Sequence, residues 1–373
     1  MNVLQVSKFY YPKIGGIEHV AHELSKACVS RGDSVTAVSA VERGLGEHSE
    51  YDGVNCFKAS SLGVRLSIPI APTFPVHLER AKRNADLMHF HLPDPLSVSS
   101  ELLTGRTDTA TVATIHGEIA KESYKRVLPL YRPVLDRFMD RVDSIVISSP
   151  RHREKSSLLS SNRDKCTVIP LGIDHDKFGS YSGPEYELPG NPNRLTVLFV
   201  GRLVYFKGIR YAIDAMKDVE ADLLIAGTGE LAGELRRRAD RQGVKDRVHF
   251  LGYVPDEKLH YCYDIADVFV LPSTTNTETF GIVQVEAMAY GTPVVNTNLD
   301  TSVPWVSQDG VTGITVPPKD ATAIADALNV LLRDPDLREK VGHAARRRAE
   351  TNFTTERMIN QYLDLYDALV ESP

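Results

Sequence analysis

The sequence predicts an α/β protein made of two doubly wound, Rossmann-like domains. Short apolar runs alternate with longer amphipathic segments, which is typical of parallel sheets covered by helices. The chain has 373 residues, too many for a single hydrophobic core. A stretch rich in Gly, Pro, Ser and Asn, from Ser180 to Arg194, separates two series of apolar runs. We therefore expect two domains joined by a linker at about residues 170–195.

The first series of apolar runs defines an N-terminal domain over residues 1–170. Its strands are expected to begin near Asn2, Ser34, Asp86, Ala110, Ser144 and Cys166. Helices are expected over residues 17–31 and 129–141. The C-terminal helix, residues 354–373, is expected to complete this domain.

The second series defines a C-terminal domain over residues 171–353. Its strands are expected at 195–200, 222–226, 247–251, 267–271 and 293–296. The last 50 residues are predicted to be helical, with Asp334-Pro335 as a helix-start signal. In such folds ligands bind at the carboxyl ends of the strands, so a cleft between the two domains is the expected ligand site.

Composition excludes several classes of protein. A net charge of −6 gives no basic field that would attract nucleic acid. The four cysteines form no CxxC pair and no zinc-site spacing, so buried thiols in a reducing compartment are expected. The N-terminus lacks signal-peptide features, and no run approaches the roughly 20 apolar residues that span a bilayer. A cytoplasmic location is therefore expected.

A cationic motif follows the first strand of the second domain. Gly201 comes directly after the strand, and Arg202 and Lys207 lie five residues apart at its C-terminal end. A forked guanidinium and a compact ammonium together suit a diphosphate. Two exposed surface cations beside a turn are the alternative.

An acidic motif lies about 70 residues further on. Glu278 and Glu286 are separated by seven residues, and a helix is expected to begin near Gly281 and end at Gly291. Carboxylates accept hydrogen bonds from sugar and ribose hydroxyls, and the helix N-terminus offers free N–H groups. The alternative makes both glutamates ordinary helix residues.

Together these motifs resemble the family-4 retaining glycosyltransferases, also called group 1 glycosyl transferases, which have the GT-B fold. The resemblance covers nearly the whole chain. Further matches, in the order of the family, are Gly15-Gly16-Ile-Glu18, Thr114-Ile-His116-Gly117, Pro170-Leu-Gly172-Ile-Asp174, Gly227-Thr-Gly229-Glu230, Gly252-Tyr253-Val-Pro255 and Pro272-Ser273. At the linker the family often has Pro-Asn-Gly where this chain has Pro170-Leu171-Gly172.

The resemblance implies a role for each matching residue. Arg202 and Lys207 would hold the donor diphosphate, Glu286 the ribose, and Glu278 the transferred sugar. His116 would contact the sugar as the family's cleft histidine; a buried histidine satisfied by backbone is the alternative. The remaining donor-binding residues would be Gly15, Gly16, Gly201, Gly229, Glu230, Tyr253, Phe280, Gly281 and Ile282.

Two metal-binding patterns are discounted. Asp174-His175-Asp176 spells Asp-x-Asp, but it falls in the linker. The resemblance moreover gives Arg202 and Lys207 the task of neutralising the phosphates. His89 and His91 share one face of a strand without a third ligand, so a strand-end pair on the acceptor side is favoured. We expect no metal and no other cofactor.

The basic amphipathic stretch 121–141 has two interpretations. It could lie on an anionic membrane surface, or it could pack its apolar stripe on the sheet as an ordinary helix, which we prefer. Resemblance to family members that glycosylate lipid-linked acceptors keeps peripheral contact with the inner membrane face as a hypothesis.

The expected reaction is a metal-independent, front-face hexosyl transfer to a glycan or lipid-linked acceptor. Segments 295–299 and 303–307 look like the mannosyltransferase branch that builds surface polysaccharides, which favours GDP-mannose over a UDP-hexose. A nucleotide-sugar 2-epimerase and a non-catalytic nucleotide-sugar-binding partner are the alternatives from other classes.

Overall fold

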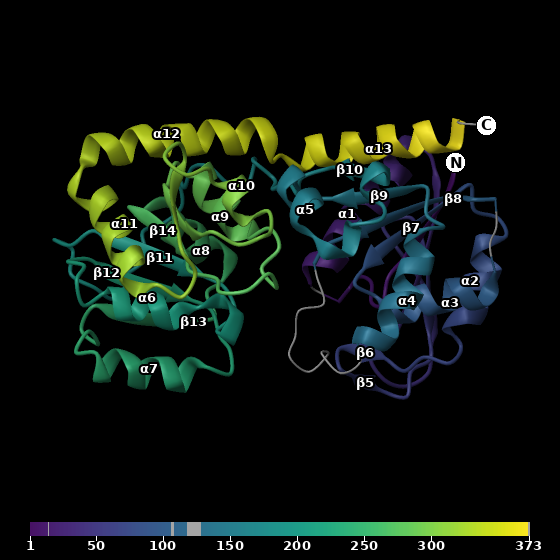
Figure 1. The fold of residues 1–373 in the computed structure, drawn as a ribbon, viewed down its shortest axis with the longest axis horizontal. Coiled ribbons are helices and arrows are strands. Elements are labelled where there is room, and N and C mark those ends of the chain that lie inside the picture. Colours follow the sequence, from purple (N-terminus) through teal and green to yellow (C-terminus); the bar gives the residue numbers. More distant parts are fainter. Residues whose placement is uncertain (14, 106–107, 118–127, 372–373) are drawn as a thin grey trace. The chain divides into compact units, whose positions relative to one another are not determined.

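The computed structural model describes residues 1–13, 15–105, 108–117 and 128–371, and these fall into two compact units. Unit 1 comprises residues 1–169 together with the chain from Met358 onward. Unit 2 comprises residues 170–357. Each unit has its own sheet with helices packed against it (Figure 1).

The sheet of unit 1 is predominantly parallel. Its strand order is β10-β9-β8-β7-β1-β2-β4-β3, so both neighbours of β1 (Asn2–Val6) run parallel to it. The other strands are β2 (Ser34–Ala40), β3 (Glu47–Tyr51), β4 (Val54–Ala59), β7 (Leu87–Leu92), β8 (Ala110–Ile115), β9 (Ser144–Ile147) and β10 (Cys166–Val168). The order reverses between β1 and β7, which makes this the switch point of unit 1.

Helices and short elements complete unit 1. They are α1 (Gly16–Arg31), α2 (Phe74–Lys82), α3 (Pro95–Thr104), α4 (Leu128–Met139), α5 (Pro150–Lys155), the two-stranded pair β5 (Val64–Arg65) and β6 (Ile68–Pro69), and most of α13 (Thr355–Glu371). Leu4, Phe74, Leu78 and Phe90 are fully buried and belong to the core beneath α2 and α3.

Unit 2 has the six-stranded order β13-β12-β11-β14-β15-β16, all parallel. The strands are β11 (Thr196–Val200), β12 (Asp222–Ala226), β13 (Val248–Gly252), β14 (Val268–Leu271), β15 (Val294–Thr297) and β16 (Gly313–Val316). Here the order reverses between β11 and β14. The loops that follow these two strands therefore flank the switch point, where open α/β sheets bind ligands.

The helices of unit 2 lie on both faces of its sheet (Figure 1). They are α6 (Ile209–Ala215), α7 (Ala232–Arg241), α8 (Asp256–Asp264), α9 (Ile282–Ala289), α10 (Val303–Val306), α11 (Ala321–Arg333) and α12 (Pro335–Asn352). As expected, Asp334 caps α12, and its side chain accepts a hydrogen bond from the N–H of Leu337 at 2.9 Å.

The turn at the start of unit 2 requires its glycine. A Cβ on Gly172 would lie 2.3 Å from the carbonyl carbon of Thr354. Ile173 donates to the carbonyl of Phe353 and accepts from the N–H of Thr355. The Pro-Leu-Gly turn thus packs its backbone directly on the segment that leads into α13.

The structure contains elements that the hydrophobic pattern missed. β3 and β4 form an antiparallel edge pair, and β3 is largely exposed, so it has no apolar run. β16 is four residues long and only half-buried at its centre. Helix α7 begins at Ala232, so Gly229 and Glu230 lie in the loop before it.

Candidate functional site

Lys207 and Glu278 form an ion pair at the switch point of unit 2. Lys207 Nζ lies 2.6 Å from Glu278 Oε2, and both side chains are about nine-tenths buried. Ser273 Oγ donates to the same carboxylate oxygen at 3.0 Å. One residue follows β11 and the other follows β14, so the reversal of strand order is what brings them together.

Close backbone packing fixes the position of Lys207. Gly208 adopts φ +65°, and a Cβ there would lie 2.0 Å from the carbonyl oxygen of Pro272. The N–H of Thr274 donates to the carbonyl of Phe206 at 2.8 Å. The glycine after Lys207 is therefore needed because the loop after β14 passes directly over it.

Glu286 completes a donor-side cluster, which we define as Lys207, Glu278 and Glu286. Tyr263 Oη donates to Glu286 Oε2 at 2.5 Å. Burial raises the pKa of Glu286, while the Tyr263 hydrogen bond and the positive charge of Lys207 act in the opposite direction. Burial also raises the pKa of Tyr263, so its hydroxyl remains a donor to the carboxylate.

Arg202 is placed differently from Lys207. Its side chain is exposed, and within the described residues it makes no hydrogen bond or ion pair. It follows Gly201, whose φ of +148° turns the chain away from β11. The structure thus leaves the guanidinium available to an anion, whereas the ammonium already has a carboxylate partner.

The glycines of the predicted donor site meet demands of packing. A Cβ on Gly227 would lie 1.9 Å from the carbonyl oxygen of Gly201, and one on Gly229 would lie 2.5 Å from that of Leu203. The loops after β11 and β12 are also joined by hydrogen bonds from Gly201 N–H to Ala226 and from Leu203 N–H to Thr228. Side-chain-free residues are therefore required here even without a ligand.

Helix α9 begins as predicted. Gly281 caps it with φ +69°, and a Cβ there would lie 2.5 Å from Leu271 Cδ2. Phe280 is buried and packs edge to face on Phe353 with ring centroids 5.8 Å apart, so only its backbone is available to a ligand. Ile282 is half-buried and opens the helix.

Tyr253 and Glu230 are exposed. The Tyr253 side chain retains 78% of its accessible surface. Both residues follow strands of unit 2 at the carboxyl edge, β13 and β12 respectively. Neither contacts the donor-side cluster among the described residues, so their roles stay predictions.

In unit 1, His116 is the half-buried end of a buried histidine network. The members of the network are Gln5, His89, His91, Thr114, His116, Tyr362 and Tyr366. His91 Nδ1 lies 2.9 Å from His116 Nε2, and His91 Nε2 lies 2.8 Å from Gln5 Oε1. His89 forms hydrogen bonds with Tyr366 Oη at 2.6 Å and with Thr114 Oγ1 at 2.7 Å. Thr114 Oγ1 in turn forms a hydrogen bond with Tyr362 Oη.

The network fixes the tautomer of His116. Burial lowers the pKa of His91 well below its usual value and that of His116 to about 4, so both imidazoles are neutral at pH 7. The amide oxygen of Gln5 only accepts, hence His91 carries its hydrogen on Nε2 and accepts at Nδ1. His116 then donates from Nε2, which leaves its Nδ1 as an acceptor for a hydroxyl.

Gly15 and Gly16 begin helix α1 next to the switch point of unit 1. Gly15 is the residue before the helix, and a Cβ there would collide with the buried Glu18 carboxylate at 2.2 Å. A Cβ on Gly16 would meet open space. The atom that a Cβ on Gly15 would meet is the end of a flexible side chain, so packing within unit 1 does not by itself require either glycine.

The discounted metal patterns have other roles in the structure. Asp174 accepts from the N–H of Asp176 and pairs with Lys177 at 3.2 Å. His89 and His91 use both ring nitrogens in the network above. Across the described ranges, no group of three or more His, Cys, Asp or Glu is placed to hold a metal ion.

The segment that suggested a mannosyltransferase is a packing element. Asn296 is buried, and its amide nitrogen bonds Gln284 Oε1 and the carbonyls of Val303 and Ser307. Its amide oxygen accepts from Thr315 Oγ1 at 2.8 Å. All of the hydrogen-bonding capacity of Asn296 is used to hold β15 to α9, α10 and β16.

The stretch 121–141 is partly outside the described residues, which resume at 128. Leu135, Phe138 and Met139 are buried in the core of unit 1, with Tyr131 and Val134 packed against them. Arg132 pairs with Asp136 at 2.7 Å. The apolar stripe over 131–139 therefore packs on the sheet, as in the preferred interpretation. In the described part of the chain, no helix is long and apolar enough to cross a membrane.

Sequence reasoning missed the partners of the predicted residues. Ser273 belongs to a family match that gives it no role of its own, while Tyr263, Gln5 and Tyr366 lie in no recognisable motif. Each contacts a predicted residue, or a neighbour of one, only after the chain has folded.

This chain matches two family models and is similar over its whole length to known proteins. The family model for "Glycosyltransferase Family 4" matches residues 14–177, and that for "Glycosyl transferases group 1" matches residues 187–348. The chain is 32% identical to O-antigen chain mannosyltransferase C of Escherichia coli, with 100% of both chains covered. It is 35% identical to the phosphatidyl-myo-inositol mannosyltransferase of Mycobacterium tuberculosis, covering 97% of this chain and 96% of that one.

Solved structures share the fold at lower identity. A sucrose-phosphate synthase from Thermosynechococcus elongatus superposes with a TM-score of 0.81 over 100% of both chains at 23% identity. HepE from Anabaena in complex with UDP-glucose superposes with a TM-score of 0.74, covering 99% of this chain and 100% of that one, at 17% identity.

Proposed function

The chain belongs to family 4 of the glycosyltransferases, with the GT-B fold, and from this premise we propose that it transfers mannose from GDP-mannose to a saccharide or lipid-linked saccharide acceptor. Family membership makes it a hexosyltransferase. One relative, 28% identical, is named a GDP-mannose-dependent mannosyltransferase, and this supports the donor. A UDP-hexose donor is the second candidate, because structural neighbours bind UDP-glucose.

The observations that carry the proposal are the donor-side cluster and the free guanidinium of Arg202, which follows the same strand as Lys207. Lys207 Nζ touches Glu278 at 2.6 Å, so a phosphate on the cation and a sugar hydroxyl on the carboxylate would lie next to each other. A sugar phosphate has this juxtaposition of groups. Glu286 would take the ribose hydroxyls in place of, or alongside, its Tyr263 bond.

We propose front-face transfer with retention at the anomeric carbon. A double-displacement reaction needs a carboxylate nucleophile beneath that carbon. Glu278 is held by Lys207 and Ser273, and Glu286 by Tyr263, so both are committed to other partners. The departing phosphate would take the proton of the acceptor hydroxyl while Arg202 and Lys207 stabilise its growing charge.

The test is a donor screen with product analysis. Purified protein is incubated with GDP-mannose, UDP-glucose or UDP-N-acetylhexosamine and a mannose oligosaccharide acceptor. We expect transfer from GDP-mannose, an α-linked product by NMR, and an unchanged rate in EDTA. Transfer from UDP-glucose alone would replace the donor, a β-linked product would refute retention, and loss of activity in EDTA would refute metal independence.

A further inference from the structure

A polar groove lies on unit 1 at the amino ends of its strands. Helix α2 covers the carboxyl half of β1, β2 and β4 with Phe74 and Leu78, and there the strands present Val6, Val38 and Ala59. On the same face, nearer the strand starts, they present Asn2, Ser34 and Thr36 instead. The change from apolar to polar residues marks where the helix cover ends, and a cavity of about 440 Å³ opens at that place.

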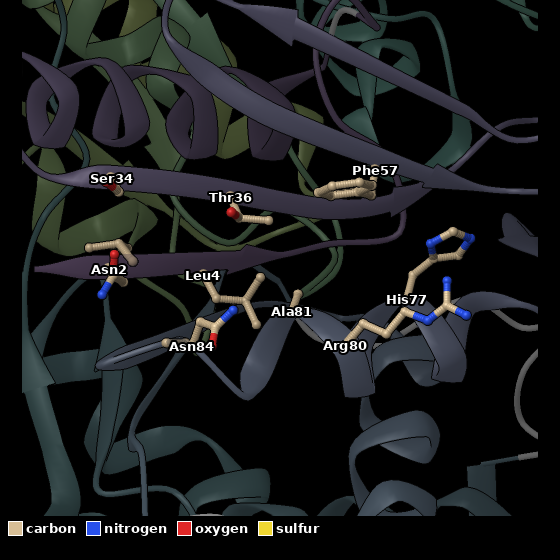
Figure 2. A pocket seen from close by; sticks show the side chains of 11 residues that line it. Asn2, Leu4, Ser34, Thr36, Phe57, His77, Arg80, Ala81 and Asn84 are labelled. Atoms are coloured by element: carbon tan, nitrogen blue, oxygen red, sulfur yellow. The ribbon is translucent and has the colours of Figure 1, made fainter.

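Figure 2 shows this groove between β2 and α2, with Ser34 and Thr36 above and His77, Arg80 and Asn84 below. These five side chains have no hydrogen-bond partner among the residues that the structure describes. Burial, and then the neighbouring Arg80, lower the pKa of His77, so its imidazole is neutral at pH 7 and can both donate and accept. None of the 11 lining residues is acidic.

The groove also has an apolar part. Leu4 is 1% exposed at its floor, and Ala81, Ala85 and the half-buried ring of Phe57 add further apolar surface. A ligand that matches must have an apolar face and a rim of groups that donate and accept hydrogen bonds. A hydrocarbon chain would leave five polar side chains unpaired. A nucleoside diphosphate would bring two charges to a single cation.

We propose that this α2 groove binds a sugar unit of a saccharide chain. A pyranose ring has an apolar C–H face for Ala81, Ala85 and the half-buried Phe57, and hydroxyls for Ser34, Thr36, Arg80 and Asn84. The volume lies within the roughly 300–1,000 Å³ of small-molecule sites. The assignment rests on the proposed function insofar as the saccharide is the acceptor.

The groove lies far from His116. Ser34 and Asn2 begin their strands, whereas His116 follows the carboxyl end of β8. The groove and His116 lie at opposite ends of the strands of one sheet. A five-residue strand spans about 17 Å, and the two places are at least that far apart. The sugar in the groove is therefore remote from the hydroxyl that reacts, and only an extended acceptor can occupy both places.

The binding experiment uses the full chain and needs no activity. Mannotriose is titrated while the amide signals of Thr36, Ala81 and Asn84 are followed by NMR. We expect these signals to shift, and Arg80→Ala or Thr36→Val to weaken binding about threefold to tenfold. Arg83→Ala is the matched control, because Arg83 lies on the same turn of the chain, pairs with Glu79 at 3.4 Å and does not line the groove.

Three results would overturn the proposal: no shift of these signals in millimolar mannotriose, equal weakening by Arg83→Ala, or shifts produced by inorganic phosphate and not by mannotriose. In the transfer assay, Arg80→Ala should raise KM for a mannose oligosaccharide long enough to reach from the groove to His116, and leave KM for GDP-mannose and kcat unchanged. If GDP-mannose proves inert, the donor assignment fails, while the titration still decides whether the groove binds saccharide.

Discussion

Both units place parallel strands on either side of a point where the strand order reverses, between β1 and β7 in unit 1 and between β11 and β14 in unit 2. The groups at these two points differ in kind. In unit 2 they are charged, with Lys207 held by Glu278 and Arg202 free. In unit 1 they are neutral, because burial keeps His91 and His116 unprotonated in a chain of hydrogen bonds.

The difference indicates a division of chemical work. Charges close to each other and partly desolvated stabilise a departing phosphate strongly. Neutral imidazoles and hydroxyls instead orient an acceptor hydroxyl through hydrogen bonds, without a strong electrostatic force on it. The comparison therefore predicts that substitutions in unit 2 affect the chemical step, while those in unit 1 affect acceptor handling and stability.

The largest effect is expected at the donor-side cations. Lys207→Ala or Arg202→Ala should reduce turnover at least a hundredfold, because in the proposed mechanism each cation stabilises the leaving phosphate, an effect worth roughly 3–4 kcal/mol. The measurement is kcat with the best donor, with melting temperature as the folding control. Lys217→Ala, an exposed lysine of the same unit, should be silent. Near-normal turnover in Lys207→Ala would remove the contrast between the units.

A smaller effect is expected at His116. His116→Ala should reduce kcat/KM for the acceptor about tenfold, since a hydrogen bond to the substrate contributes about 1.4 kcal/mol or less when neutral. His91→Leu should have part of this effect, because it frees the His116 tautomer that His91 now fixes. Restored activity in His91→Gln, which keeps an acceptor near that position, would support positioning. If His116→Ala, His91→Leu and His91→Gln all had the same kcat/KM for the acceptor, the positioning role of His91 would be contradicted.

Acidification should destabilise unit 1 through its histidines. Burial holds the pKa of His89 at about 3 and that of His116 at about 4 in the folded chain. Unfolded histidines titrate near 6.5, so the unfolded state binds more protons below that pH and stability falls from pH 6.5 to about 3, the folded pKa of His89. A fall of several degrees in melting temperature over this range is the expected result. His89→Leu should flatten the dependence, and an unchanged slope in that variant would place the titrating groups elsewhere.

The smallest effect is expected from Tyr366→Phe. Its hydroxyl bonds His89 Nδ1 at 2.6 Å in a buried setting, so its loss leaves that ring nitrogen unpaired. The free energy of unfolding should fall by about 1–2 kcal/mol, with kcat nearly unchanged. Urea titration measures the first quantity. Tyr181→Phe is the control, because Tyr181 is in unit 2 and its hydroxyl bond is exposed.

Most of the fold could be predicted from the pattern of buried strands. β1, β2, β8, β9 and β10 begin at the expected residues, because parallel strands covered on both faces need continuous apolar runs. The exposed strand β3 could not be predicted in this way, since an edge strand at the surface carries no continuous apolar run. The α2 groove could not be predicted from the sequence either, because its residues come from three strands and a helix that share no motif.

The sequence by itself determined the family, the glycine-rich turns and the four charged residues around the second switch point, because each motif lies within about ten consecutive residues after one strand. Tertiary structure alone decided which groups hold them: Ser273 and Lys207 on Glu278, Tyr263 on Glu286, and Gln5 through His91 on His116. The reason is physical. A buried polar group must find a partner wherever the fold supplies one, and here several partners lie 20 or more residues away in the chain.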